Sequence, residues 1–161
     1  MSTGADLFIQ GYKDYNEGEL DRECWESYSF AYLECVYDIA AKATGVKNPL
    51  KYGVHVHELE VDDDVLIEYF GITEAEFYDD LDTDYWGDYL NANEVEPLFD
   101  AAEVYDSLTA LIAWFEKDPN DSYECDHDSA YKEDILDDLR TMREDVALAK
   151  QRGNKVRIEL G

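Results

Sequence analysis

The chain has 161 residues, of which 45% are hydrophobic and 14% aromatic, and its 13 Lys and Arg against 40 Asp and Glu give a net charge of −27. This apolar and aromatic content argues against a disordered chain. No stretch approaches the ~20 apolar residues that a membrane span needs. The charge also argues against direct binding to nucleic acid or to anionic lipid, because both are themselves anionic.

The negative charge is concentrated in the middle of the chain. From Tyr52 to Glu116 there is no Lys or Arg, whereas 19 residues are Asp or Glu. Protein surfaces normally intersperse both signs of charge, which limits self-repulsion. A domain of this length has a diameter of roughly 40 Å, and duplex DNA of that length carries roughly two dozen phosphates. The charge therefore favours a DNA mimic, with halophilic adaptation and an incidentally acidic enzyme as alternatives.

The first 45 residues predict two strands and a helix. Leu7–Ile9 has the apolar character of a short strand, and Trp25 lies where a second strand would return. Ser27 or Ser29 can then cap a helix, whose apolar residues recur at helical spacing until Gly45 ends it.

The acidic middle begins with a strand and continues with short helices. The β-branched alternation of Tyr52–Leu59 predicts the strand. Asp62–Asp64 is suited to a helix start, because acidic side chains complement the helix dipole there. Thr73 and Glu76 fit the capping box of a following helix.

Two longer helices and a strand are predicted for the remainder. The first helix covers about 94–116, where Pro97 is tolerated only in the first turn. Residues 118–128 are predicted to form a polar loop, and a last helix covers about 129–150. The alternation of apolar residues over 156–160 predicts a terminal strand.

These elements predict an α+β fold, with small strand-containing modules at the N- and C-terminal ends and a helical acidic middle. We expect an N-terminal α+β module over 1–60, an acidic helical middle over 61–117 and a C-terminal helix–strand module over 118–161. An elongated arrangement of these modules and one continuous domain are both compatible with the pattern.

The carboxylates of the middle segment are the candidate phosphate-mimicking residues, and no catalytic residue, metal or cofactor is predicted. Tyr78, Tyr85 and Tyr89 lie among them and offer aromatic faces beside anions, a combination that Arg and Lys bind well. The candidates are Asp62, Asp63, Asp64, Glu68, Glu74, Glu76, Asp79, Asp80, Asp82, Asp84, Asp88, Asp100, Glu103 and Asp106.

Histidine and cysteine side chains supply the alternative from another class, a small acidic metal-binding protein or enzyme. His55 and His57 would share one face of a strand, and Cys125 lies in a mixed Cys-Asp-His-Asp segment. No zinc-type ligand spacing supports such a site. Because Cys24, Cys35 and Cys125 are odd in number and have no close pairing motif, we expect reduced thiols and a cytoplasmic location.

Two segments resemble the ArdA family of antirestriction proteins. Tyr15 to Leu20 reads Tyr-Asn-Glu-Gly-Glu-Leu and is similar to the family's Tyr-Asn-x-Gly-x-Leu loop, with Trp25 as the counterpart of the Trp that follows it. Tyr52 to Glu58 is similar to the strand that ends the family's N-terminal module. The resemblance covers roughly the first 60 residues. It implies a modular α+β protein, often dimeric, that occupies the DNA groove of type I restriction–modification enzymes.

The sequence therefore predicts a non-enzymatic inhibitor that competes with DNA for a basic DNA-binding protein of a defence system in the host-cell cytoplasm. A type I restriction–modification enzyme is the first expected target, and a CRISPR effector is the alternative. An acidic chaperone or antitoxin-like module that shields a basic partner is a third interpretation. A homodimer is also expected, because a DNA footprint longer than one domain requires two copies.

Overall fold

The computed structural model describes residues 4–10, 25–55, 63–79 and 96–160. It is a mixed α+β structure, as predicted, with 59% of the described residues in helices and 22% in strands. In chain order, with η denoting a 3₁₀ helix, the elements are β1 (Ala5–Ile9), β2 (Glu26–Ser27), η1 (Phe30–Leu33), α1 (Glu34–Thr44), η2 (Pro49–Tyr52), β3 (Gly53–His55), α2 (Asp63–Phe70), α3 (Glu74–Asp79), β4 (Phe99–Asp100), α5 (Ala101–Lys117), β5 (Ser122–Cys125), β6 (Asp128–Tyr131), α6 (Lys132–Arg152) and β7 (Lys155–Leu160).

The main sheet is organised around the last strand, β7. Strand β1 pairs with β7 in antiparallel register along its length, and β2 extends the sheet beyond β1. On the other edge of β7, β4 pairs antiparallel with its beginning and β3 pairs parallel with its end. Gly53 in β3 is required by this close approach, because a Cβ there would lie 2.9 Å from both the Leu160 side chain and the Leu50 carbonyl oxygen.

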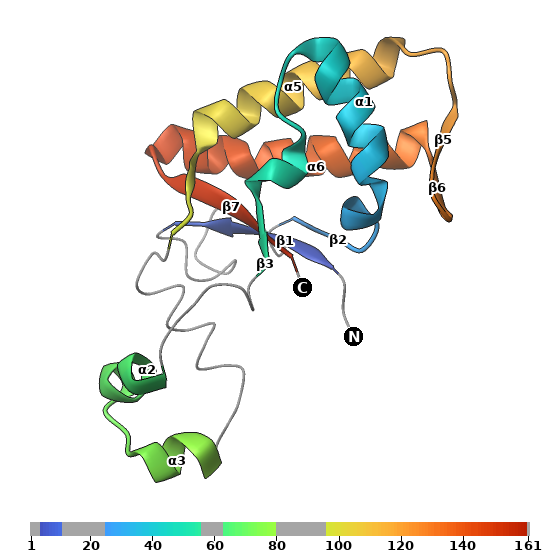
Figure 1. Cartoon of the computed structure of the whole chain (residues 1–161). Coiled ribbons are helices and arrows are strands. Elements are labelled where there is room, and N and C mark those ends of the chain that lie inside the picture. The colour runs from blue at the N-terminus through green and yellow to red at the C-terminus, as the bar shows by residue number, and fades with distance from the viewer. Residues whose placement is uncertain (1–3, 11–24, 56–62, 80–95, 161) are drawn as a thin grey trace.

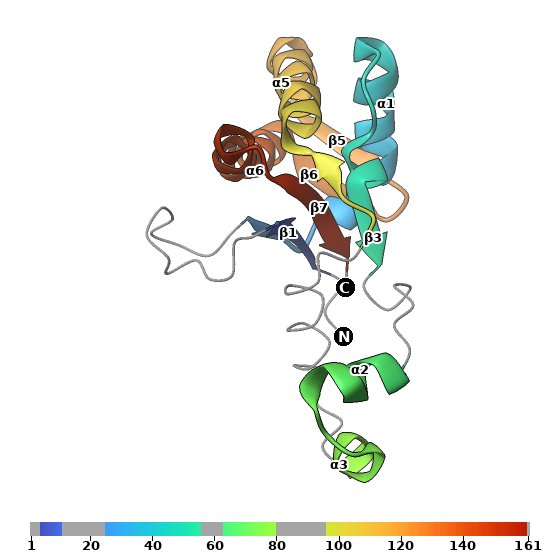
Figure 2. The same cartoon turned by 90° about the vertical axis from the view of Figure 1, so that its left-hand side faces the viewer.

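Helices α1, α5 and α6 cover one face of the sheet (Figures 1 and 2). The alternation of β7 places Val156, Ile158 and Leu160 on that face, where they join the buried apolar side chains of the three helices in one core. The other face carries Arg157, which is fully buried, pairs with Glu159 at 2.9 Å and stacks over the Phe8 ring. The terminal strand is thus confirmed.

Two carboxylates of α6 fix the start of β2. The fully buried Asp145 accepts the Trp25 backbone N–H at 2.5 Å. Asp138 accepts the Trp25 indole N–H at 3.0 Å and the Ser27 hydroxyl at 2.7 Å, and burial raises its pKa. The Ser27 hydroxyl also accepts the Phe30 backbone N–H at 3.2 Å, at the start of η1, whereas the N-cap residue of η1, Ser29, makes no side-chain capping hydrogen bond.

Several other predicted elements are confirmed. The helical stop at Gly45 is observed, with φ at 77°. The expected strand over Tyr52–Leu59 is observed over β3, and residues 56–59 lie outside the described residues. Helix α2 begins in the predicted acidic triplet. At the predicted capping box of α3, the Thr73 hydroxyl accepts the Glu76 backbone N–H and donates to the Glu76 carboxylate, each at 3.1 Å.

Two predicted boundaries are wrong. The long helix starts at Ala101 rather than near residue 94, because Phe99 and Asp100 are extended and pair with β7. Pro97 therefore precedes the helix instead of occupying its first turn. Residues 118–128 are not a simple polar loop, because β5 and β6 pair over 122–131 as an antiparallel hairpin, which also moves the start of α6 to Lys132.

The sheet joins segments that the sequence assigned to different modules. Strands β1 and β3, from the segment 1–60, both pair with β7, from the segment 118–161. Helix α5, from the middle segment, shares their core. Helices α2 and α3 lie apart from this body, on the side of the sheet opposite α1, α5 and α6 (Figures 1 and 2).

Candidate acidic interface

Helices α2 and α3 carry six of the predicted carboxylates and no Lys or Arg over residues 63–79. All six side chains are exposed: Asp63, Asp64, Glu68, Glu74, Glu76 and Asp79. Neighbouring residues explain why these helices form: acidic residues in both first turns complement the helix dipoles, and Gly71 takes a positive φ of 67° between the two helices. Leu66 and Phe77 are buried, whereas the charges point to solvent. The pair is therefore an ordered scaffold for carboxylates.

Aromatic side chains accompany these carboxylates on the surface. Tyr69 and Tyr78 are 44% and 49% exposed. The Tyr78 hydroxyl donates to Asp63 Oδ2 at 3.1 Å, and this hydrogen bond to a carboxylate raises the pKa of Tyr78. The contact links α3 to the first turn of α2, so it orients both an anion and an aromatic ring. Such a surface can receive guanidinium groups through ion pairing and stacking.

A second group of predicted carboxylates lies at the start of α5. Asp100, Glu103 and Asp106 are exposed and lie off the core face, as predicted. Glu103 is already engaged, since it lies 3.6 Å from Lys47 Nζ and accepts the Tyr52 hydroxyl at 3.4 Å. This group is separated from α2 and α3 by the sheet (Figures 1 and 2). The described candidates thus form two surfaces rather than one continuous stripe.

The other candidates lie outside the described residues: Asp62, Asp80, Asp82, Asp84, Asp88, Tyr85, Tyr89 and His57. The same is true of the segment from Tyr15 to Leu20 and of Cys24. Their predicted roles remain predictions.

Sequence reasoning missed a third acidic surface, on the β5–β6 hairpin and the first turns of α6. The signal was present, because no Lys or Arg occurs between Lys117 and Lys132. The prediction of a polar loop over 118–128 did not include the β5–β6 hairpin that carries several carboxylates of this surface. The exposed carboxylates there are Asp121, Glu124, Asp126, Asp128, Glu133, Asp134 and Asp137.

A polar network fixes the base of this hairpin. Asp118 Oδ2 accepts the Tyr123 hydroxyl at 2.6 Å, which lowers the pKa of Asp118, while burial and the same bond raise the pKa of Tyr123. Lys132 Nζ donates to the Asp118 carbonyl oxygen at 2.5 Å. The Tyr123 ring packs edge-on against Phe115 at 5.3 Å. The hairpin is therefore attached to α5 through both polar and aromatic contacts.

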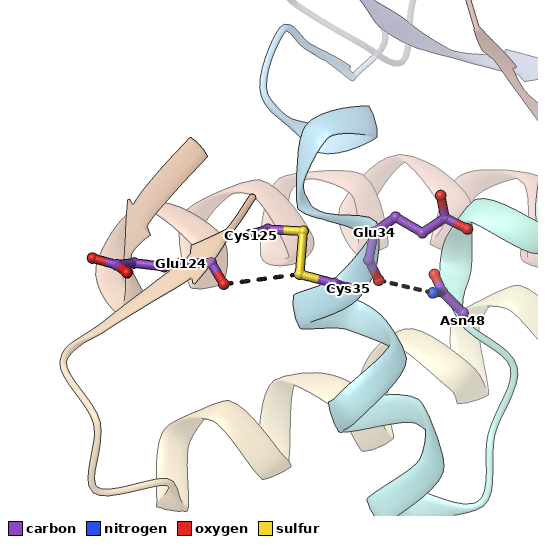
Figure 3. Close-up of a disulfide and its surroundings, with 5 residues drawn as sticks. All are labelled: Glu34, Cys35, Asn48, Glu124 and Cys125. Carbon is purple, nitrogen blue, oxygen red and sulfur yellow. Dashed lines mark hydrogen bonds between the residues drawn. A yellow bond between two sulfur atoms is a disulfide. The ribbon is translucent and has the colours of Figure 1, made fainter. Parts of the chain in front are cut away.

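The expectation of reduced thiols is wrong for two of the three cysteines. Cys35 of α1 and Cys125 of β5 form a disulfide across 90 residues of chain, with Cα atoms 5.8 Å apart (Figure 3). Cys35 Sγ lies 3.8 Å from the Glu124 carbonyl oxygen, a contact in which only the reduced thiol has a proton to donate. Cysteines distant in sequence can meet only through the fold, which is why spacing gave no sign of this pair.

The described residues assemble no metal site of the kind considered as an alternative. No group of three His, Cys, Asp or Glu side chains among them is arranged to hold a metal ion. His55 lies in β3 of the main sheet, whereas Cys125 lies in the hairpin. In its disulfide state Cys125 has no thiolate to offer a metal or a substrate.

No described helix is both long enough and apolar enough to cross a membrane. Comparison with protein-family models, with curated proteins and with solved structures finds no match to this chain. The assignment of a function therefore depends on the chemistry of the acidic surfaces.

Proposed function

We propose that this protein is a non-enzymatic DNA mimic, which inhibits a DNA-binding defence protein by occupying its DNA groove. The observation that carries the proposal is the α2–α3 pair, where six exposed carboxylates occur over residues 63–79 without a cation. Carboxylates on helices keep defined positions, as the phosphates of a duplex do. The basic groove of a DNA-binding protein is the surface that such an array complements.

The absence of Lys and Arg from residues 63–79 leaves the carboxylates of α2 and α3 available to a basic partner. Burying an apolar core does not require the exposed Asp and Glu of α2 and α3, and their mutual repulsion opposes folding. A basic partner would relieve that repulsion and displace the cations that gather around the carboxylates, as it displaces the counterions of DNA. The exposed Tyr69 and Tyr78 rings would add stacking surfaces for Arg side chains of the groove.

Type I restriction–modification enzymes in the host cytoplasm are the proposed first target. The resemblance of Tyr15–Leu20 and Tyr52–Glu58 to the ArdA family supports this choice. A CRISPR effector is the second target to examine, because its DNA channel is also basic.

The proposal is tested by the salt dependence of binding to a purified type I enzyme. We expect the affinity to fall steeply as salt rises from 50 to ~200 mM, because each contact replaces ion pairs that the enzyme also makes with phosphates. The protein alone should not retard duplex DNA in the same buffers. An affinity that does not change over this range would contradict a mimic that binds through charge.

A further inference from the structure

A row of large apolar side chains is exposed on the segment that contains η1 and α1. Tyr28, Tyr32 and Ile39 are 70%, 44% and 61% exposed. Tyr32 and Ile39 form this row, because Tyr32 and Cys35 line the same hollow and Ile39 lies one helical turn after Cys35 in α1, whereas Tyr28 precedes η1. The opposite side is already apolar and buried in the core, through residues such as Phe30 and Val36. The exposed row is therefore in excess of what the fold requires.

The β5–β6 hairpin lies beside this row and creates two open hollows. Tyr131, at the end of β6, is 70% exposed. The larger hollow, of about 490 Å³, lies between Tyr32 of η1 and the turn of the hairpin, with the Cys35–Cys125 disulfide in its wall. The smaller one, of about 400 Å³, lies between Ser29 and Tyr131. Together the hollows and the exposed rings form what we call the hairpin surface.

Carboxylates surround the apolar part of the hairpin surface. Those lining the two hollows are Glu34, Asp38, Asp126, Asp128, Glu124 and Asp134. Lys51 is the one Lys or Arg among the described residues that line the two hollows. Lys42, which lies nearby on α1, is bound to Asp38 at 2.9 Å. An apolar centre with a charged rim is the usual anatomy of a protein-binding surface, and here the rim is acidic.

The hairpin surface is held in place before any partner arrives. The disulfide joins β5 to α1, and the Tyr123–Asp118 hydrogen bond joins β5 to the end of α5. Asn48 accepts the Leu50 N–H at 3.0 Å and donates to the Glu34 carbonyl oxygen at 3.2 Å, which fixes the other wall of the larger hollow (Figure 3). A preformed surface loses less conformational entropy on binding.

We propose that the hairpin surface docks a basic, amphipathic protein segment, with apolar side chains against Tyr32, Ile39 and Tyr131 and Arg or Lys side chains in the two acidic hollows. The negative charge of the rim favours a basic partner over the other possible occupants. A second copy of this chain would bring two acidic rims together, and DNA or an anionic membrane would be repelled. This interface is separate from α2 and α3, and it does not depend on DNA mimicry.

The test uses the full-length, oxidised, isotope-labelled protein and two synthetic helical peptides of equal length and Arg content. One peptide has a Leu face bordered by Arg, and in the other each Leu is replaced by Ser. We expect the Leu/Arg peptide to bind about tenfold more tightly, since burial of the Leu side chains adds to a shared charge term. Its NMR shift changes should cluster in 28–39 and 122–134.

Matched substitutions complete the test. Ile39→Ser should weaken binding of the Leu/Arg peptide about five- to tenfold, because it removes an apolar contact beside the larger hollow, and leave the Ser/Arg peptide unaffected. Val65→Ser, which removes an exposed apolar side chain from α2, is the control and should change neither affinity. Equal binding of the two peptides, or shift changes centred on α2 and α3, would overturn the proposal. So would a dimer, found by sedimentation without peptide, that Ile39→Ser dissociates.

Discussion

Neutralising four carboxylates of the α2–α3 pair should weaken inhibition far more than neutralising four elsewhere. The variant combines Asp64→Asn, Glu68→Gln, Glu74→Gln and Asp79→Asn, and keeps Asp63 and Glu76, which hold Tyr78 and the capping box. An exposed ion pair contributes about 0–1 kcal/mol, so four together contribute roughly 2 kcal/mol. This corresponds to roughly a 30-fold increase in the inhibition constant.

The control variant makes the same change in net charge at exposed carboxylates outside the two groups of predicted candidates, with three of the four on the third acidic surface: Asp6→Asn, Asp121→Asn, Glu133→Gln and Asp137→Asn. Both variants should fold, which circular dichroism and thermal melting will establish. Asp64 and Glu68 are like charges at i, i+4 on α2, so their removal relieves repulsion within the helix. Inhibition constants for the two variants are then measured against the same target enzyme at one salt concentration. Equal losses would refute the assignment of α2 and α3 as the contact surface.

Three further predictions concern single groups and the disulfide. Asp79→Asn alone should change the inhibition constant less than about fivefold, because one rim charge contributes at most about 1 kcal/mol; an abrupt loss of activity with the fold intact would indicate a catalytic carboxylate. Asp138→Ala should destabilise the fold by about 1–3 kcal/mol in denaturant titration, because its two buried donors lose their acceptor. Because burial raises the pKa of Asp138 in the folded state, the stability that its protonated form contributes is lost as pH rises above 3.8. The stability of Asp138→Asn relative to the unsubstituted protein, measured by thermal melting, should therefore increase from pH 4 to pH 7. Reduction of Cys35–Cys125 by a dithiol should lower the unfolding free energy by about 2–4 kcal/mol, and an unchanged melting temperature would show that this link does not constrain the chain.

The strongest periodic signals in the sequence predicted elements correctly. The alternation of Val156, Ile158 and Leu160 gave the terminal strand, and the Thr73–Glu76 capping box gave the start of α3. Both are local patterns, in which a few neighbouring residues determine the backbone. The fold class followed from them.

The predictions that failed depend on contacts distant in sequence. The local sequence predicts that Phe99 and Asp100 belong to a helix, but they are extended because they pair with β7, more than 50 residues later. The Cys35–Cys125 link likewise requires α1 and β5 to meet, which local spacing cannot reveal. The candidate site was predicted in part, because charge counts along the chain located the acids of α2 and α3. They could not show that the sheet separates those acids from the group on α5.

Competition with DNA tests mimicry most directly. The inhibition constant of the protein against a type I restriction–modification enzyme is measured at increasing concentrations of unmodified duplex DNA that contains the recognition site. If both polyanions require the same basic groove, the apparent inhibition constant should rise in proportion to the DNA concentration. An inhibition constant that stays unchanged while the groove remains occupied by DNA would place the protein at another site and contradict the account.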